Sequence, residues 1–155
     1  MRMPCQLLSI AAAVLLVFTA GCASPSSSRI PRPTTGGRVY LLETTGYCPC
    51  RECCGWKRNW LGRPVFASGA LKGRSKPIGM CASGVYAQPG TLAADTRLFP
   101  FGTLMYIPGY GYGRVEDRGE KIKGFRVDLY FESHEQALQW GRSKKQARVW
   151  RPSPL

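Results

Sequence analysis

The stretch FRVDLYF, at residues 125–131, has the alternation of a half-buried β-strand. Val127 and Leu129 lie on one face of such a strand, and Asp128 and Tyr130 lie on the other. Aspartate is a poor strand residue, so a charge kept at this position needs a purpose or a partner. If the valine face packs into a core, Asp128 points into a groove or the mouth of a barrel.

Working outward from this stretch, other segments also have the composition of short strands, and glycine and proline turns separate them. They lie at residues 38–47, 91–95, 103–108, 113–117 and 146–150. One helix is expected, because Ser133 and Gln136 have the spacing of a capping box and Gly141 ends the apolar run. Residues 48–79 have the composition of a loop region. Many short strands with one short helix predict a mainly β fold, a small closed barrel.

The N-terminus has the features of a secretory signal of the lipoprotein type at residues 1–21: a basic start, an apolar run and small residues. The run ends in TAGC, so Cys22 is expected to carry lipid. Thr19 stands where leucine is usual, which leaves ordinary cleavage nearby as one alternative. An uncleaved membrane helix is a second alternative, although spanning needs roughly 20 apolar residues. Ala23 after Cys22 favours the outer membrane if the host has two.

The remaining chain divides into three segments by composition. Residues 22–37 are rich in serine, proline and glycine and predict a flexible tether. Residues 38–82 are expected to hold a strand and a cysteine-rich loop region, and residues 83–151 a barrel domain. The protein is therefore expected to be exported and membrane-anchored, facing the periplasm or the cell wall.

The charge balance is strongly basic, with 22 Lys and Arg against 9 Asp and Glu and a formal net charge of +13. In a cytosolic protein this balance favours nucleic acid as the partner. An exported protein meets other polyanions, such as the carboxylates of cell-wall peptides and anionic headgroups. No nucleic-acid partner is expected.

The segment YCPCRECCGW, at residues 47–56, holds a dense group of cysteines. The five cysteines beyond the signal and Cys22 are Cys48, Cys50, Cys53, Cys54 and Cys81. Disulfides are the first interpretation for an exported chain. A small metal site is the second interpretation, because the spacing fits no usual pair of separated zinc-binding motifs, and free structural thiols are the third. A catalytic thiol is disfavoured, since the one histidine, His134, is expected elsewhere, in the helix.

The chain contains three aspartates, and each lies in or at the end of an expected strand. They are Asp95, Asp117 and Asp128. Taken singly, each aspartate is explained as an ordinary surface residue or as the cap of a turn. Three aspartates that all lie near strands and glycines, in a basic protein, together indicate a carboxylate site.

The motifs around these aspartates resemble a known family. They read A-x-D-(x6)-G-T, E-D-x-G-(x2)-I-K-G, R-x-D-x-(Y/F)-F and S-H-x-(x)-A-L-x-W-G-R, from about residue 83 to residue 149. This pattern resembles the three-aspartate (3D) domain of bacterial cell-wall proteins and of the membrane-bound lytic transglycosylase A superfamily. YCPCRECCG and CASG resemble a cysteine-bearing subgroup. The resemblance implies a six-stranded double-psi β-barrel.

The resemblance also implies an activity, cleavage of peptidoglycan glycan strands as a lytic transglycosylase. The muramic acid's own C6 hydroxyl attacks, giving a 1,6-anhydro end, so one carboxyl serves as acid and then as base. This role falls on Asp128, with Asp117 and Asp95 keeping it protonated by charge crowding or holding it by hydrogen bonds. Residues 122–124 are expected to line the groove. Lys123, Gly124 and Tyr130 are the expected substrate contacts, and no metal or cofactor is needed.

The chain departs from the family pattern at two places. Glu120 and Lys121 stand where glycine and alanine are usual, and Cys81 stands where threonine is common. These departures keep two further functions open. One is a non-catalytic peptidoglycan-binding lipoprotein on the same barrel, and the other is a structural lipoprotein. The expected partners are peptidoglycan glycan strands and, through the lipid anchor, the membrane.

Overall fold

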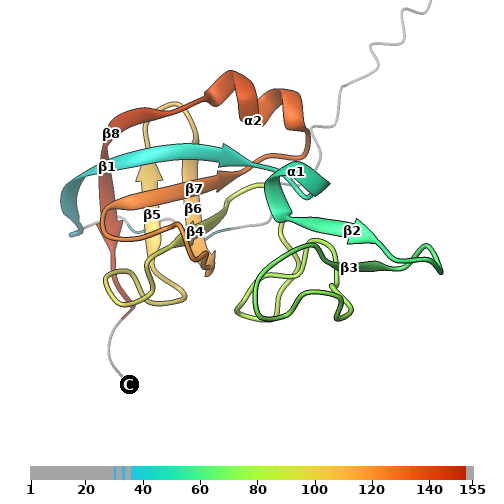
Figure 1. Cartoon of the computed structure of the whole chain (residues 1–155). Coiled ribbons are helices and arrows are strands. Elements are labelled where there is room, and N and C mark those ends of the chain that lie inside the picture. The colour runs from blue at the N-terminus through green and yellow to red at the C-terminus, as the bar shows by residue number, and fades with distance from the viewer. Residues whose placement is uncertain (1–29, 31–32, 34–35, 153–155) are drawn as a thin grey trace, which may run out of the picture.

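The computed structural model describes residues 30, 33 and 36–152, and the expected signal peptide, Cys22 and most of the tether lie outside this part. Six strands close into a barrel in the order β1-β7-β4-β6-β5-β8 (Figure 1). They are β1 (Arg38–Tyr47), β4 (Thr91–Ala94), β5 (Leu104–Ile107), β6 (Gly111–Asp117), β7 (Arg126–Tyr130) and β8 (Ser143–Trp150). The prediction of a mainly β, six-stranded barrel is confirmed.

Two of the six pairings are parallel, β1 with β7 and β4 with β6, and the other four are antiparallel. Strands paired in parallel need long connections, and here each parallel pair is separated by other strands in the chain. This mixed arrangement fits the double-psi barrel that the family resemblance implies. Because the barrel includes β1, it takes strands from both sides of the cysteine-rich segment.

The core fills the inside of the barrel with apolar side chains from every strand. Its fully buried large members are Leu42, Leu92, Phe99, Met105, Ile107, Val115, Val127 and Leu129. Burying one such side chain contributes about 1.5–3 kcal/mol. The expected alternation of residues 125–131 is confirmed, since Val127 and Leu129 face this core and Asp128 lies on the other face.

Helix α2 (His134–Trp140) begins with the predicted capping box of Ser133 and Gln136 and ends at Gly141. It lies across the outside of the barrel, next to β1 (Figure 1). A hydrogen bond of 3.2 Å from Trp140 Nε1 to Thr44 Oγ1 ties it to that strand. Among the described residues, no helix is long and apolar enough to cross a membrane.

The segment expected to be loop contains further short elements. Helix α1 (Arg51–Cys54) is a single turn that ends at Gly55, whose backbone is left-handed at φ 57°. Strands β2 (Trp56–Arg58) and β3 (Pro64–Phe66) form a hairpin that projects beside the barrel (Figure 1). The single-helix prediction therefore missed α1. A helix of one turn has too few residues for a hydrophobic period to show in the sequence.

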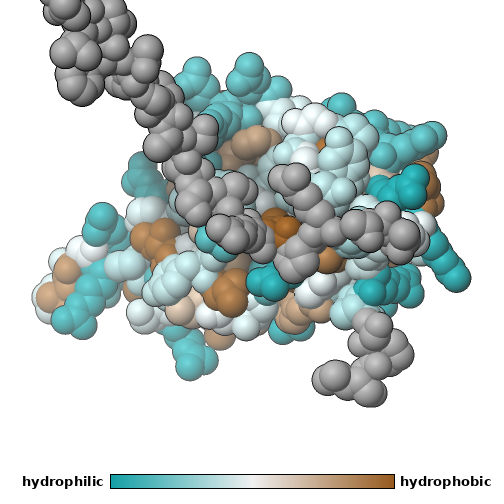
Figure 2. Space-filling model, turned by 180° about the vertical axis from the view of Figure 1, so that it is seen from behind, coloured by the Kyte–Doolittle hydropathy of each residue, from teal (hydrophilic) through white to brown (hydrophobic). Residues whose placement is uncertain are grey.

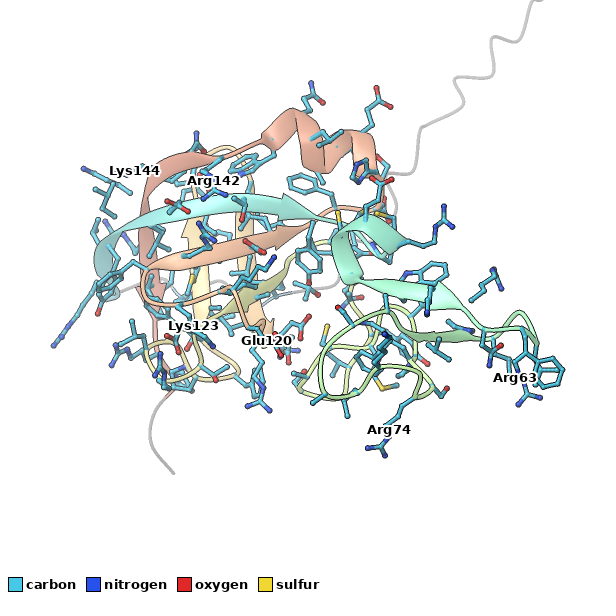
Figure 3. The ribbon with its side chains drawn as sticks, in the orientation of Figure 1. Arg63, Arg74, Glu120, Lys123, Arg142 and Lys144 are labelled. Carbon is cyan, nitrogen blue, oxygen red and sulfur yellow. The ribbon has the colours of Figure 1, made fainter. Side chains whose placement is uncertain are left out.

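Apolar and basic residues are dispersed over the surface. Seen from behind, hydrophobic residues form separate patches among hydrophilic ones (Figure 2). Arg63 lies at the hairpin tip, Arg74 on the loops beside it and Lys144 at the far side of the barrel (Figure 3). Basic residues therefore lie both on the barrel and on the cysteine-rich segment.

Gly46→Ala is expected to destabilise the fold. A Cβ at Gly46 would lie 2.7 Å from the carbonyl oxygen and 2.9 Å from the Cα of Ala137 in α2, and backbone cannot move aside as a side chain can. The overpacking should lower the free energy of unfolding by about 1–3 kcal/mol, measured by urea denaturation. Leu138→Ala on the exposed side of α2 is the control, with a change within about 0.5 kcal/mol. Equal stability of both variants would contradict this packing of α2.

Candidate active site

A row of residues crosses four neighbouring strands at one height of the barrel. Thr45 of β1 pairs with Asp128 of β7, Asp128 pairs with Ala93 of β4, and Ala93 pairs with Asp117 of β6. Directly paired residues point to the same side of a sheet. Asp117 and Asp128 therefore share one face, two strands apart, with a backbone separation of about 10 Å. The small side chain of Ala93 leaves the space between them open.

Asp128 is half-buried on the face of β7 that points away from the core. The Thr45 hydroxyl donates a hydrogen bond to Asp128 Oδ1. Burial raises the pKa of Asp128 above its ordinary value, because desolvation disfavours the charged form. Thr45, Arg126 and Arg142 oppose this shift in pKa, and Glu43 adds to it. The largest cause is thus burial, and not the charge crowding by Asp95 and Asp117 that the sequence suggested.

Asp117 lies at the end of β6 and is half-buried. Its Oδ1 accepts hydrogen bonds of 2.9 Å from the backbone N–H groups of Ala82 and Arg118. These bonds fix the carboxylate against the loop that follows β6 and against the segment containing Cys81. Asp117 is therefore held in position by backbone, facing the same space as Asp128.

Asp95 differs from the other two aspartates because it is buried and fully engaged in hydrogen bonds. The Arg97 guanidinium donates to both carboxylate oxygens, at 3.0 and 2.8 Å, and the Gly124 N–H donates to Oδ2 at 3.0 Å. The hydrogen bonds from Arg97 and Gly124 hold the pKa of Asp95 well below its ordinary value. An acid of this kind stays ionised, so its geometry suits positioning of the 119–124 loop rather than proton transfer.

Two adjoining cavities lie along this face. The narrower, of about 240 Å³, is lined by Ala93, Asp117, Asp128, Tyr47 and Tyr130 among others. The wider, of about 770 Å³, includes Asp95, Asp117, Glu120 and Lys123 in its lining. Asp117 lines both cavities, so they adjoin there, and we call the two together the groove. Glu120 and Lys123 lie on the loop at its edge, between the barrel and the cysteine-rich half (Figure 3).

The three expected substrate-contact residues lie in different settings. Tyr130 is buried in the wall of the narrower cavity, and Lys123 lines the wider one. The Lys123 ammonium donates a 3.4 Å hydrogen bond to the Gly119 carbonyl, so it lies along its own loop. Gly124 is the backbone donor to Asp95, with a positive φ of 64°. Its role is therefore to fix the loop through Asp95.

The groove contains one residue that sequence reasoning missed, Tyr47. It pairs with Tyr130 in register, and the two rings meet edge to face at 5.6 Å. Within the described part of the chain, the buried Tyr47 hydroxyl has no hydrogen-bond partner. Burial, with the charge of Asp117, raises the pKa of Tyr47, so the hydroxyl remains a donor. Tyr47 therefore contributes an aromatic wall to the groove, with its hydroxyl buried behind that wall.

The altered loop at Glu120 and Lys121 does not strain the backbone. No described residue other than glycine has a positive φ. The loop therefore does not require the glycine that the family pattern has at residue 120. Its effect on the groove is electrostatic, since Glu120 adds a negative charge to the wider cavity beside Lys123.

The five cysteines in the described residues are free, and none of the expected disulfides is formed. Cys48, Cys50 and Cys53 instead converge on His134, which the sequence had placed apart from them. Cys54 and Cys81 lie in the wall of the narrower cavity. The first three cysteines are thus grouped around an imidazole, next to the groove.

Comparison with known proteins gives a match to one family model and partial matches to two longer relatives. Residues 90–151 match the family model of the 3D domain. YabE of Bacillus subtilis (strain 168), named as a cell wall shaping protein, is 31% identical over 58 residues, which are 37% of this chain and 14% of YabE. YocH of the same organism, named as a cell wall-binding protein, is 36% identical over 50 residues, which are 32% of this chain and 17% of YocH.

A solved structure has a partial likeness to this chain. The crystal structure of Escherichia coli MltA with bound chitohexaose has 20% sequence identity and a TM-score of 0.42. The match covers 52% of this chain and 30% of MltA. The chain therefore spans less than a third of each of these three longer proteins.

Asp128→Asn is expected to stabilise the folded chain at neutral pH. Burial raises the pKa of Asp128 in the folded state, so ionisation above the unfolded pKa costs folding free energy that an amide does not incur. The gain in melting temperature should be largest at pH values above the pKa of Asp128 in the folded state. It should disappear as the pH falls below the pKa of Asp128 in the unfolded state. Thermal denaturation from about pH 3 to about pH 8 measures this dependence.

Asp95→Asn is the matched control, with the opposite sign. The pKa of Asp95 is lowered in the folded state, so its carboxylate stabilises the fold above the unfolded pKa and loses this effect as pH falls. The melting temperature of the variant should therefore be lower than that of the wild type at neutral pH, and the two melting temperatures should become equal in acid. The same sign of change for both variants would contradict the assigned environments.

Proposed function

Because residues 90–151 match the family model of the 3D domain, we propose that this chain cleaves peptidoglycan glycan strands by a lytic transglycosylase reaction. Its products carry 1,6-anhydro-muramic acid ends. The observation that carries this proposal is Asp128, a half-buried carboxyl with a raised pKa in a groove shared with Asp117. The wall-related names of YabE and YocH support peptidoglycan as the substrate class.

The reaction needs one group that gives up a proton and then takes one back. Protonated Asp128 donates its proton to the glycosidic oxygen, and the bond from that oxygen to the muramic C1 breaks. The C6 hydroxyl of the same sugar attacks C1 and passes its proton to the Asp128 carboxylate, which restores the acid. No water is consumed. A raised pKa supports the first step, because it keeps more of the acid protonated near neutral pH.

The other groove residues are assigned positioning roles. Asp117, held by two backbone N–H groups, presents its carboxylate as an acceptor for sugar hydroxyls. Tyr47 and Tyr130 pack edge to face in the cavity wall that also holds Asp128, and so shape the groove there. Lys123 is positioned for a carboxylate of the stem peptide at the groove edge. Asp95 holds the loop that carries Lys123, through its bond to Gly124.

A second candidate function is a non-catalytic peptidoglycan-binding lipoprotein on the same barrel. The altered loop at Glu120 and Lys121 favours it, since the chain departs from the family pattern there, in the lining of the wider cavity. In this function the aspartates bind sugar hydroxyls and no bond is cut. YocH, named as a cell wall-binding protein, supports the same alternative.

For location, we propose an exported lipoprotein anchored through Cys22, with the barrel facing the cell wall. The support is the signal-like run at residues 1–21 and the TAGC that ends it. Ala23 favours the outer membrane in a host with two membranes. The broad positive charge of +13 favours contact with wall carboxylates and anionic headgroups.

Asp128→Asn is expected to abolish the release of anhydro-muropeptides, because an amide cannot donate the proton that the leaving oxygen requires. The full chain is incubated with purified murein, and the soluble products are identified by mass spectrometry. General acid–base groups contribute about 10²–10⁴-fold, so the rate should fall at least a hundredfold. Asp117→Asn should cost less, in keeping with a positioning role.

The matched control is Glu132→Gln, which makes the same change at an exposed carboxylate just after β7. It should leave the rate unchanged, and pelleting with murein should remain for both variants. A loss under about tenfold for Asp128→Asn would remove Asp128 from the chemistry. Reducing ends would show that water attacks, and binding without any release by the wild type would establish the binding function instead.

Cys22→Ala is expected to abolish lipid attachment. In cells given a palmitate analogue, the wild-type chain should be labelled and the variant should not, because the thiol of Cys22 is the proposed acceptor. Cys81→Ser is the control and should be labelled as strongly as the wild type. Equal labelling of the wild type and Cys22→Ala, or labelling of neither, would contradict the anchor.

A further inference from the structure

A cluster of three cysteines and one histidine lies beside the groove, and it plays no part in the proposed reaction. Its ligand atoms are the sulfurs of Cys48, Cys50 and Cys53 and a ring nitrogen of His134, all within 4.8 Å of one another. We propose that these four residues bind one zinc ion in a closed, structural site. The site is independent of the proposed function, because it takes no part in cleaving the glycan.

The distances in the cluster are those that a tetrahedral zinc site imposes. Zinc bonds of about 2.3 Å to sulfur and about 2.05 Å to nitrogen place two sulfurs about 3.8 Å apart and a sulfur and a nitrogen about 3.6 Å apart. In the structure, the sulfurs of Cys48 and Cys53 are 3.7 Å apart. His134 Nδ1 lies 3.8 Å from the Cys48 sulfur and 3.5 Å from each of the other two. These four distances match a tetrahedral zinc site, and all the ligand atoms lie within 4.8 Å of one another.

The imidazole is oriented as a metal ligand should be. His134 Nδ1 faces the sulfurs, and its other ring nitrogen, Nε2, lies 3.1 Å from a carboxylate oxygen of Glu52. A carboxylate that accepts the Nε2 proton fixes the tautomer with a lone pair on Nδ1. A metal-bound histidine almost always donates its other ring N–H to a carboxylate, a backbone carbonyl or water. The contact with Glu52 is therefore an observation separate from the sulfur geometry.

The backbone also supports the sulfurs. The Cys53 N–H donates a 3.4 Å hydrogen bond to the Cys50 sulfur, which caps helix α1. Such a bond stabilises a thiolate more than a thiol, because the acceptor then carries full charge. Cys48 is buried, and the other ligands are more accessible. A metal ion can therefore reach the site from the surface.

Zinc accounts for the cluster better than a disulfide does. Three sulfurs converge here, and a disulfide would use two of them and leave the third cysteine and His134 unexplained. A site with three thiolates and one imidazole in tetrahedral arrangement is typical of structural zinc. Four protein ligands leave no open position for water, so the site holds structure and does no chemistry.

The place of the cluster in the fold shows what it would hold together. Cys48 follows Tyr47 at the end of β1, Cys50 caps α1, Cys53 lies in α1, and His134 begins α2. A zinc ion therefore joins the base of the cysteine-rich segment to the barrel and to its helix. Because Cys48 is next to Tyr47, the same ion fixes the wall of the groove in which Asp128 lies.

The test measures metal in the full chain purified without chelator from cells supplied with zinc. Plasma mass spectrometry should find about one zinc per chain. Cys50→Ala and His134→Ala should each lose most of it. Cys54→Ser and Cys81→Ser, which alter neighbouring thiols outside the cluster, are the matched controls and should retain it.

A second measurement, which does not depend on the cysteine and histidine variants folding, uses cobalt as a probe of the site. Cobalt added to the apo chain should give the visible absorption of a tetrahedral thiolate site, and zinc should displace it. Glu52→Gln should weaken zinc binding about 10–100-fold while leaving the fold intact. Glu135→Gln, which changes the next residue of α2 but not the Glu52 contact, should bind zinc as the wild type does.

Each result decides the proposal. One zinc per chain that is lost with the cluster variants and kept in the controls supports it. A chain without zinc whose cluster cysteines form disulfides, or one that holds iron in place of zinc, overturns it. Zinc content that is equal in Glu52→Gln and wild type at limiting metal would remove the assigned role of Glu52. None of these readouts uses murein, so cleavage activity and the zinc site stand or fall separately.

Discussion

Strands β1 and β7 lie side by side in parallel, and this contact sets Thr45 beside Asp128 and Tyr47 beside Tyr130. The two strands are about eighty residues apart in sequence, and Thr45 and Asp128 are separated by 83 positions. A shift of one residue in this register would turn Asp128 and Tyr130 into the core and bring Val127 and Leu129 to the surface. The buried apolar faces of both strands oppose that shift. Hydrophobic burial thus fixes the position of the carboxylate.

The same pairing determines how the aspartates differ. Asp128 lies among strands, where burial removes water and leaves Thr45 as its hydrogen-bond donor. Asp95 lies just beyond β4, where the chain turns and Arg97 and a loop N–H can reach it. One carboxyl is therefore driven toward its neutral form and the other is held ionised. Residue type alone does not distinguish them, since all three are aspartates, and it is their surroundings that separate proton transfer from positioning.

Most of the fold could be predicted from the sequence because its signals are local. The alternation at residues 125–131 and the capping box at Ser133 each depend on neighbours within a few positions. The partners of the site are not local. Tyr47 meets Tyr130, and His134 meets Cys50 across 84 positions, only through parallel pairing and the packing of α2 on β1. A lone histidine in an amphipathic helix carries no sign of such a partner, so the sequence alone does not link His134 to the cysteines.

The groove lies where the barrel meets a segment that has little core of its own. Among the described residues between β1 and β4, few apolar side chains are buried, and those of the hairpin tip, such as Trp60, are exposed. Hydrophobic burial therefore gives this segment little stability. It nevertheless supplies one wall of the groove, including Cys54 and Cys81.

A wall of this kind keeps its shape only if it is tied to the barrel by something other than packing. Hydrogen bonds such as that from Ala82 to Asp117 contribute at one end. At the other end lies the cysteine and histidine cluster, next to Tyr47, where a bound ion would compensate for the missing core.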